Sequence, residues 1–271
     1  MADQHSTSDN DTKSELRGAL MMVAAFAAIA AVFAVGATIY SVTRGDDDDG
    51  ILRAVIVDQL DLTFPNQDFR DQTTETLEAA GYIVDYVPGV DVTVDYYRDL
   101  PTHGYDLVLL RSHVARVGEA SGERLALAEI FTSEPYSRSE HVWEREHGYI
   151  GGVTYNDDGS GNVEEAYFGI GPAFVLERMN GRFNGSTIVM MGCSGLFSEA
   201  MAEAFIRKGA DAFVSWNDLV SAEHTDAATL RLVERMVVDE LSVADATEAT
   251  MAEIGPDPYY DSTLLSYPPQ D

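Results

Sequence analysis

The longest apolar run of the chain lies near its start. Residues 18–43, between Arg17 and Arg44, read GALMMVAAFAAIAAVFAVGATIYSVT and carry no charge. A membrane-spanning helix needs about 20 apolar residues, whereas the apolar part of a signal peptide has about 7–15. The run therefore predicts an uncleaved, single-pass transmembrane anchor. Small residues at Ala34, Gly36 and Ala37 leave a cleavable signal as the alternative.

Beyond residue 52, short apolar runs alternate with segments of helical periodicity. Runs typical of buried strands lie at 53–59, 82–87, 105–112, 186–191 and 211–215. Helical spacing predicts helices at 69–80, 196–209 and 225–241, and a capping pattern at Ser242 and Asp245 predicts a last helix to about 254. This alternation predicts an α/β fold with a doubly wound, mostly parallel sheet.

The same pattern divides the chain into segments. Residues 1–17 form a polar, acidic tail that we expect to be disordered, and residues 44–52 form a short acidic linker. The α/β domain spans 53–255, with an insertion at 114–185 between the third and fourth strands. Extended stretches at 149–155 and 163–170 could pair there as a hairpin around 156–162. We expect Pro256 and Pro258 to end regular structure, which leaves a draped or loose tail over 256–271.

Charge excludes two classes of partner. The formal net charge is −29, from 46 acidic and 17 basic residues, and the only lysines are Lys13 and Lys208. A chain without a basic patch does not neutralise nucleic-acid phosphates or dock on anionic lipid headgroups. This composition resembles that of proteins from halophilic archaea, in which concentrated salt screens the self-repulsion. An acidic surface chosen for solubility is the alternative.

The orientation of the anchor follows from the basic residues that flank it. Lys13 and Arg17 precede the run, and Arg44 and Arg53 follow it, so the positive-inside count is close to a tie. We expect a cytoplasmic N-terminus in the cell membrane and an extracellular domain. The oligomeric state is left open.

Candidate chemistry lies where two predicted strands end. His113 follows the third strand in VLLRSH, and Cys193 follows the fourth in IVMMGCSG. Ligands bind beyond the carboxyl ends of such strands. If the two strands are neighbours, the side chains lie close together, and an imidazole beside a thiol is a general base beside its nucleophile. A helix from Leu196 would further favour the Cys193 thiolate through its dipole.

These residues resemble the caspase-like (clan CD) cysteine peptidases, nearest the CHAT-domain and gingipain branches. The parallel covers about residues 53–255 and is clearest in the text that follows Cys193. The resemblance implies a peptidase that acts on peptides or proteins, with Cys193 as nucleophile and His113 as base, and the predicted anchor would hold it at the membrane. We expect no cofactor and no metal.

The resemblance also assigns supporting roles. The backbone N–H groups of Cys193 and Val114 would stabilise the oxyanion, although the family usually has glycine where Val114 stands. Ser215 and Trp216 would flank the substrate cleft. Asp58 would line the specificity pocket, and a basic residue before the scissile bond would then be favoured.

Other interpretations of these residues stay open. Loss of the chemistry would leave a non-catalytic binding or sensor module, and Cys193 could also act between chains as a redox sensor. Ser194 lacks the last glycine of a hydrolase elbow, because Leu196 stands there. The spacing of His141, Glu144 and His147 suggests zinc, but surface residues explain it equally well. The segment 169–174 lacks the third glycine of a dinucleotide loop, and 156–162 favours a turn over a calcium site.

Overall fold

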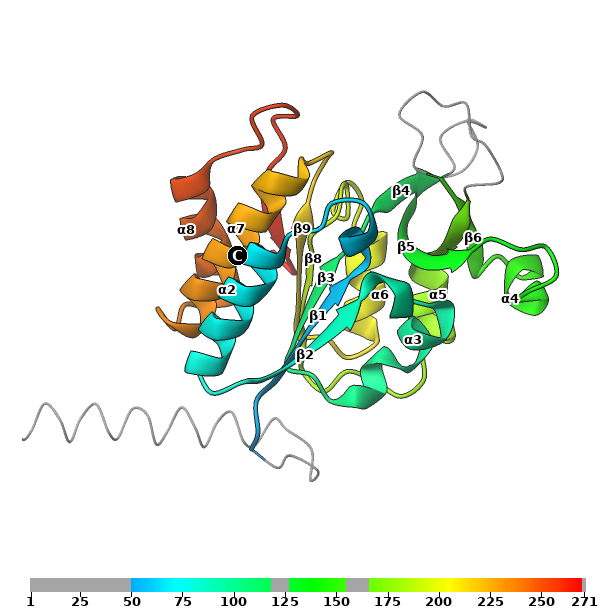
Figure 1. Ribbon diagram of the computed structural model, residues 1–271, viewed down its shortest axis with the longest axis horizontal. Coiled ribbons are helices and arrows are strands. Elements are labelled where there is room, and N and C mark those ends of the chain that lie inside the picture. Colours follow the sequence, from blue (N-terminus) through cyan, green and yellow to red (C-terminus); the bar gives the residue numbers. More distant parts are fainter. Residues whose placement is uncertain (1–49, 118–126, 155–165, 270–271) are drawn as a thin grey trace, which may run out of the picture. The chain divides into compact units, whose positions relative to one another are not determined.

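The computed structural model describes residues 50–117, 127–154 and 166–269 (Figure 1). The predicted anchor at 18–43, the tail before it and most of the acidic linker lie outside these residues, as does the turn at 156–162. Among the described residues, no helix is both long enough and apolar enough to cross a membrane.

The described chain has an α/β architecture built on a six-stranded, largely parallel sheet, as predicted (Figure 1). The strand order is β10-β9-β8-β3-β1-β2, and only β10 runs antiparallel, against β9. The strands are β1 (Arg53–Asp58), β2 (Ile83–Pro88), β3 (Leu107–Arg111), β8 (Thr187–Met190), β9 (Ala212–Trp216) and β10 (Leu264–Tyr267). All five predicted strands are present.

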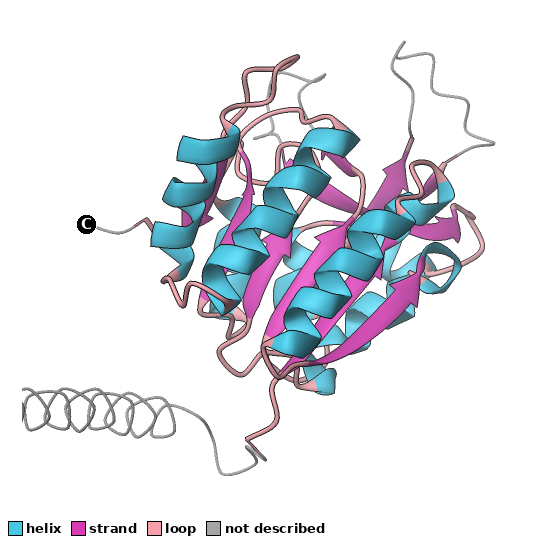
Figure 2. Cartoon of the chain, turned by 60° about the vertical axis from the view of Figure 1, so that its left-hand side comes forward, coloured by secondary structure: helices cyan, strands magenta, loops and turns pink. Residues whose placement is uncertain are grey.

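Helices cover both faces of this sheet, because side chains of each buried strand alternate between two cores. Ala54 and Ile56 of β1 join one core, and Val55 and Val57 join the other. Helices α2 (Gln67–Ala79), α7 (Ala222–Val237) and α8 (Val243–Ile254) lie on the first face, side by side in Figure 2. On the second face lie α3 (Val94–Asp99), α5 (Pro172–Glu177) and α6 (Ala200–Arg207).

Short 3-10 helices η1 (Gln59–Leu62), η2 (Gly89–Asp91) and η3 (Leu100–His103) connect these elements. The predicted cap of the last helix is confirmed: Asp245 N donates to the Ser242 side chain at 3.2 Å.

The insertion between β3 and β8 forms a second sheet of four antiparallel strands in the order β4-β5-β7-β6. Its elements are β4 (Val114–Val117), β5 (Leu127–Pro135), α4 (Val142–Glu146), β6 (Ile150–Val153) and β7 (Tyr167–Ile170). The expected pairing of the two extended stretches is confirmed in β6 and β7. Ile130, Phe168 and Ile170 join the second core of the domain, which attaches the insertion to the main sheet.

Two sequence-based expectations about element boundaries were wrong. Regular structure does not end at Pro256 and Pro258, because β10 pairs with the edge of β9 and buries Leu264 opposite Trp216. The helix after β8 begins at Ala200 and not at Leu196. Turns occupy the intervening residues, where Leu196 N donates to Trp216 O and Ser194 N donates to Asp218 O.

Candidate functional site

The strand order reverses between β1 and β3, since the chain goes from β1 to β2 on one side and later returns to β3 on the other. In a doubly wound sheet, the crevice for ligands lies at the carboxyl ends of such a pair of strands. Asp58 ends β1 and Arg111 ends β3. Because β8 pairs with β3, Cys193 follows a strand next to the one that His113 follows.

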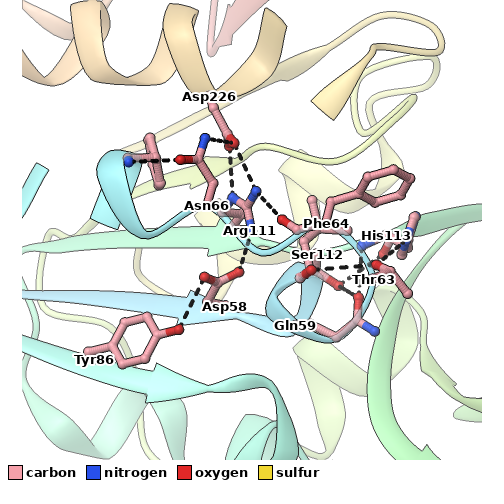
Figure 3. Close-up of polar contacts among 12 residues, drawn as sticks. Asp58, Gln59, Thr63, Phe64, Asn66, Tyr86, Arg111, Ser112, His113 and Asp226 are labelled. Carbon is pink, nitrogen blue, oxygen red and sulfur yellow. Dashed lines mark hydrogen bonds and ion pairs between the residues drawn. The ribbon is translucent and has the colours of Figure 1, made fainter. Parts of the chain in front are cut away.

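Backbone and ring contacts hold His113 in place (Figure 3). Its N–H donates to Gln59 Oε1 at 3.1 Å, and its carbonyl accepts from Phe131 N at 3.0 Å. Nε2 lies 3.1 Å from the Thr63 hydroxyl, and the ring lies 5.9 Å from that of Phe64, centroid to centroid. Burial and the neighbouring charge of Arg111 lower the pKa of His113 to about 4. The imidazole is therefore neutral, and so able to act as a base, at neutral pH.

The Cys193 side chain is half-buried and interacts with Val220. The thiol donates to Val220 O at 3.6 Å and accepts from Val220 N at 3.5 Å. Burial raises the pKa of Cys193, which keeps the thiol protonated. The expected help from a helix dipole is absent, because α6 begins only at Ala200 and the field of a helix falls off within its first turn.

The loops that carry Cys193 and His113 are in direct contact. A Cβ placed on Gly192 would lie 2.2 Å from Ser112 O and 2.7 Å from Val114 Cγ2, so only glycine fits there. The structure thus brings the two residues to neighbouring strand ends. The thiol, however, takes its hydrogen bonds from Val220 and not from the imidazole.

The register of β4 and β5 leaves the Val114 N–H outside their pairing. Val114 lies opposite Ile130. The neighbouring residues His113 and Phe131 are joined by a backbone hydrogen bond, and hydrogen-bonded and non-hydrogen-bonded pairs alternate along an antiparallel ladder. Val114 and Ile130 therefore form a non-hydrogen-bonded pair. In such a pair the N–H groups point away from the partner strand. The Val114 N–H is therefore directed away from β5, as a donor to an oxyanion would have to be.

Asp58 is buried, and its charge is matched within the protein (Figure 3). Arg111 Nη1 donates to Asp58 Oδ1 at 2.7 Å, and the Tyr86 hydroxyl donates to Asp58 Oδ2 at 3.2 Å. Burial raises the pKa of Asp58, while Arg111 acts against this rise. A carboxylate already paired in this way does not offer a free charge to a basic substrate residue.

Arg111 is the functional-site residue that the sequence reasoning missed. It is fully buried and donates two hydrogen bonds to Asp226 of α7, from Nε to Oδ1 at 2.7 Å and from Nη2 to Oδ2 at 2.8 Å. We call Arg111 with its two acidic partners, Asp58 and Asp226, the clamp. Nη2 also donates to Phe64 O at 2.8 Å. Burial disfavours its charge, but the bonds to Asp226 and the charges of both acids outweigh this and raise the pKa of Arg111. An arginine that ends a buried strand was the available signal, since such a charge needs buried partners.

A pocket of about 290 Å³ opens beside this clamp and is lined by Thr63, Phe64, Pro65, Asn66, Arg111, Ala222, Glu223 and Asp226.

Ser215 and Trp216 lie inside the domain and not at a cleft. Both side chains are fully buried. The Ser215 hydroxyl donates to Met190 O at 2.7 Å, and Trp216 Nε1 donates to Thr225 Oγ1 at 2.9 Å. Their side chains thus tie β9 to β8 and α7, and neither is exposed to a ligand.

The three residues with zinc-like spacing each have a partner of their own. His141 Nε2 lies 2.6 Å from Glu134 Oε1, Glu144 is paired with Arg98 at 3.1 Å, and His147 Nδ1 lies 2.7 Å from Trp143 O. They do not converge on one point, and the described part of the chain holds no group of three or more potential metal ligands.

Comparisons with known proteins do not identify a family for this chain. No protein-family model matches it, and neither does any curated protein sequence. The functional assignment therefore depends on the geometry of the β1, β3 and β8 strand ends.

Proposed function

We propose that the chain is a membrane-anchored cysteine peptidase of the caspase-like type, with Cys193 as nucleophile and His113 as general base. The observation that carries this proposal is the contact of Gly192 with Ser112 and Val114. It joins the ends of β8 and β3, so that a thiol and a neutral imidazole follow neighbouring strands beside a topological switch point.

The chemistry uses the neutral imidazole. His113 accepts the thiol proton as Cys193 Sγ attacks the carbonyl carbon of a peptide bond, and a C–S bond forms. The N–H groups of Cys193 and Val114 stabilise the oxyanion. The imidazolium then protonates the leaving amine as the C–N bond breaks. Water, deprotonated by His113, cleaves the thioester and restores the thiol.

Substrate binding must first release the thiol from Val220. Burial keeps Sγ protonated at rest, and the reaction needs the hydrogen bonds to Val220 exchanged for one with His113. Catalytic hydrogen bonds commonly tighten only when substrate is bound. A rotation of the Cys193 side chain would make the exchange.

The predicted anchor at 18–43 would tether this site to the cell membrane, with the domain on the outer side. Substrates would then be peptides or proteins near the bilayer. Shaving intact cells with an added protease tests the orientation: loss of the domain is expected, and its full protection would reverse the assignment.

A second function is favoured by the state of the thiol. A raised pKa and a thiol held by Val220 also suit a non-catalytic binding module that keeps the fold. The two functions differ in one measurable respect, which is whether Cys193 forms a covalent acyl-enzyme.

The deciding experiment is labelling by peptidyl electrophiles in high salt, with hydrolysis of a peptide library beside it. The full chain should be labelled and active, Cys193→Ala should lose both, and His113→Gln should lose most of both. The control is Ser198→Ala, which removes a hydroxyl from the same loop and should keep both labelling and hydrolysis. Labelling and hydrolysis that are absent, or unchanged in Cys193→Ala, would favour the binding module.

A further inference from the structure

The segment between β9 and α7 contacts the Cys193 thiol. It comprises residues 217–221, which we call the strap. Val220 of the strap accepts a hydrogen bond from the thiol through its carbonyl at 3.6 Å and donates one to Sγ through its N–H at 3.5 Å. Beside the thiol, Ser194 N donates to Asp218 O of the strap at 2.8 Å. The strap therefore bonds to the Cys193 loop at two neighbouring points.

The two ends of the strap are fixed to the C-terminal segment. Asn217 N donates to Thr263 O at 3.1 Å, and Thr263 N donates to Asn217 Oδ1 at 2.9 Å, which continues the pairing of β9 with β10. Ser221 donates from its N–H and from its hydroxyl to Asp257 Oδ2, at 2.9 and 2.7 Å, and the Asp257 side chain is buried. Any local opening of the strap therefore takes place in its middle, at residues 218–220.

A side chain from the insertion holds the middle of the strap. Arg116 of β4 donates from Nη2 to Asp218 Oδ1, and its guanidinium lies 4.9 Å from the centroid of the Phe197 ring. Asp218 Oδ1 also accepts from Leu219 N at 2.7 Å. The side chains of Arg116 and Asp218 are 28% and 53% exposed, so the pair lies at the surface of the domain. Exposed ion pairs contribute little stability, so this pair can hold the strap without making the contact permanent.

We propose that the Arg116–Asp218 ion pair latches the strap onto Cys193, and that its opening releases the thiol from Val220. The inference concerns access to the thiol and does not depend on the reaction that the thiol performs. In the proposed peptidase the closed latch is an autoinhibitory contact, because Sγ has to leave Val220 before it attacks a substrate carbonyl. Opening a few residues of a loop costs far less than unfolding the domain.

The charges of the pair, taken without a latch, predict a different behaviour. Burial raises the pKa of the Cys193 thiol, and in addition the charge of Arg116 lowers this pKa while that of Asp218 raises it. The thiolate is the nucleophile. Without a latch, loss of the Arg116 charge would slow the reaction of the thiol, and loss of the Asp218 charge would speed it. With a latch, both losses speed the reaction, because either one frees the strap.

Alkylation by iodoacetamide, a small neutral reagent, measures how often the thiol is free. Cys193 is the only cysteine of the chain, so the mass of the intact protein reports its modification. The full chain is compared with Arg116→Met, which keeps a long apolar side chain, and with Asp218→Ser, which shortens the side chain but keeps an oxygen. The matched controls Arg70→Met and Asp71→Ser remove a surface ion pair on α2. All rates are measured at one pH and one salt concentration.

Both latch variants should react about three- to fivefold faster than the unchanged chain, the factor by which an exposed ion pair shifts a local equilibrium. The double variant should gain no more than either single one, because the latch is already open, and the two controls should react at the unchanged rate. Opposite effects of the two changes, a gain in only one of them, or no gain would overturn the latch. Urea unfolding of each variant accompanies the rates, and a gain fully explained by lost stability of the whole domain would overturn it too.

Discussion

Gly192 of the loop after β8 lies directly against the carbonyl oxygen of Ser112, at the end of β3: a Cβ on Gly192 would be 2.2 Å from that oxygen. The atom in the way is backbone and cannot turn aside. The contact holds the Cys193 loop against the His113 loop, and its loss tests whether their juxtaposition matters.

Gly192→Ala should therefore destabilise the domain and separate the two loops. Overpacking of this kind costs about 1–3 kcal/mol. Urea unfolding would measure the loss, and labelling by peptidyl electrophiles should fall with it under conditions where the variant is folded. Gly171→Ala is the matched control, since its Cβ meets only ordinary contacts at 3.7 Å or more. Full stability in Gly192→Ala would show that the loops can move apart freely.

The buried clamp on Arg111 predicts a large effect of a single truncation. Arg111→Ala leaves Asp58 and Asp226 buried without their shared cation, and breaking such a network costs about 3–5 kcal/mol. Thermal or urea unfolding measures the loss. Arg70→Ala removes a guanidinium that pairs with Asp71 at the surface and should change stability far less. Similar losses in the two variants would argue against a clamp.

The loss of activity on acidification should occur only at low pH. The His113 imidazole acts as a base only when neutral, and its pKa is lowered from 6.5 to about 4. Activity should hold as pH falls through 6.5 and decline only as pH approaches about 4. Rates of labelling by a peptidyl electrophile between pH 3.5 and 8 provide the profile. A midpoint near 6.5 would contradict the buried position of the ring.

Glu129 should make the stability of the domain depend on pH. Burial raises its pKa to about 7 in the folded chain, from near 4.5 when unperturbed, so the folded state binds more protons between these values. The stability linked to this group is fully present below about pH 4.5 and is lost as pH rises to about 7. Glu129→Gln should remove that part of the slope and gain about 1–3 kcal/mol at pH 8. Unfolding curves at pH 5 and pH 8 measure it, and Glu146→Gln should keep the slope.

Local pattern determined the main sheet. Apolar runs marked all five parallel strands. Four of them, β1, β3, β8 and β9, lie inside the sheet, and a strand buried on both faces must be apolar throughout. The cap at Ser242 could also be predicted from the sequence, because it depends only on two residues three positions apart. The same runs placed His113 and Cys193 at strand ends, and hence on one edge of the sheet.

Only the tertiary structure decided which partners these residues take. Arg111 meets Asp58 and Asp226 across separations of 53 and 115 residues, which no local pattern reports. The edge strand β10 follows two prolines and forms because β9 offers an unpaired edge. Cys193 lies opposite Val220 and not at a helix start, because the chain turns before α6. The buried Glu129 Oε2, which has no hydrogen-bond partner among the described residues, is likewise a product of the packed sheet that the sequence did not reveal.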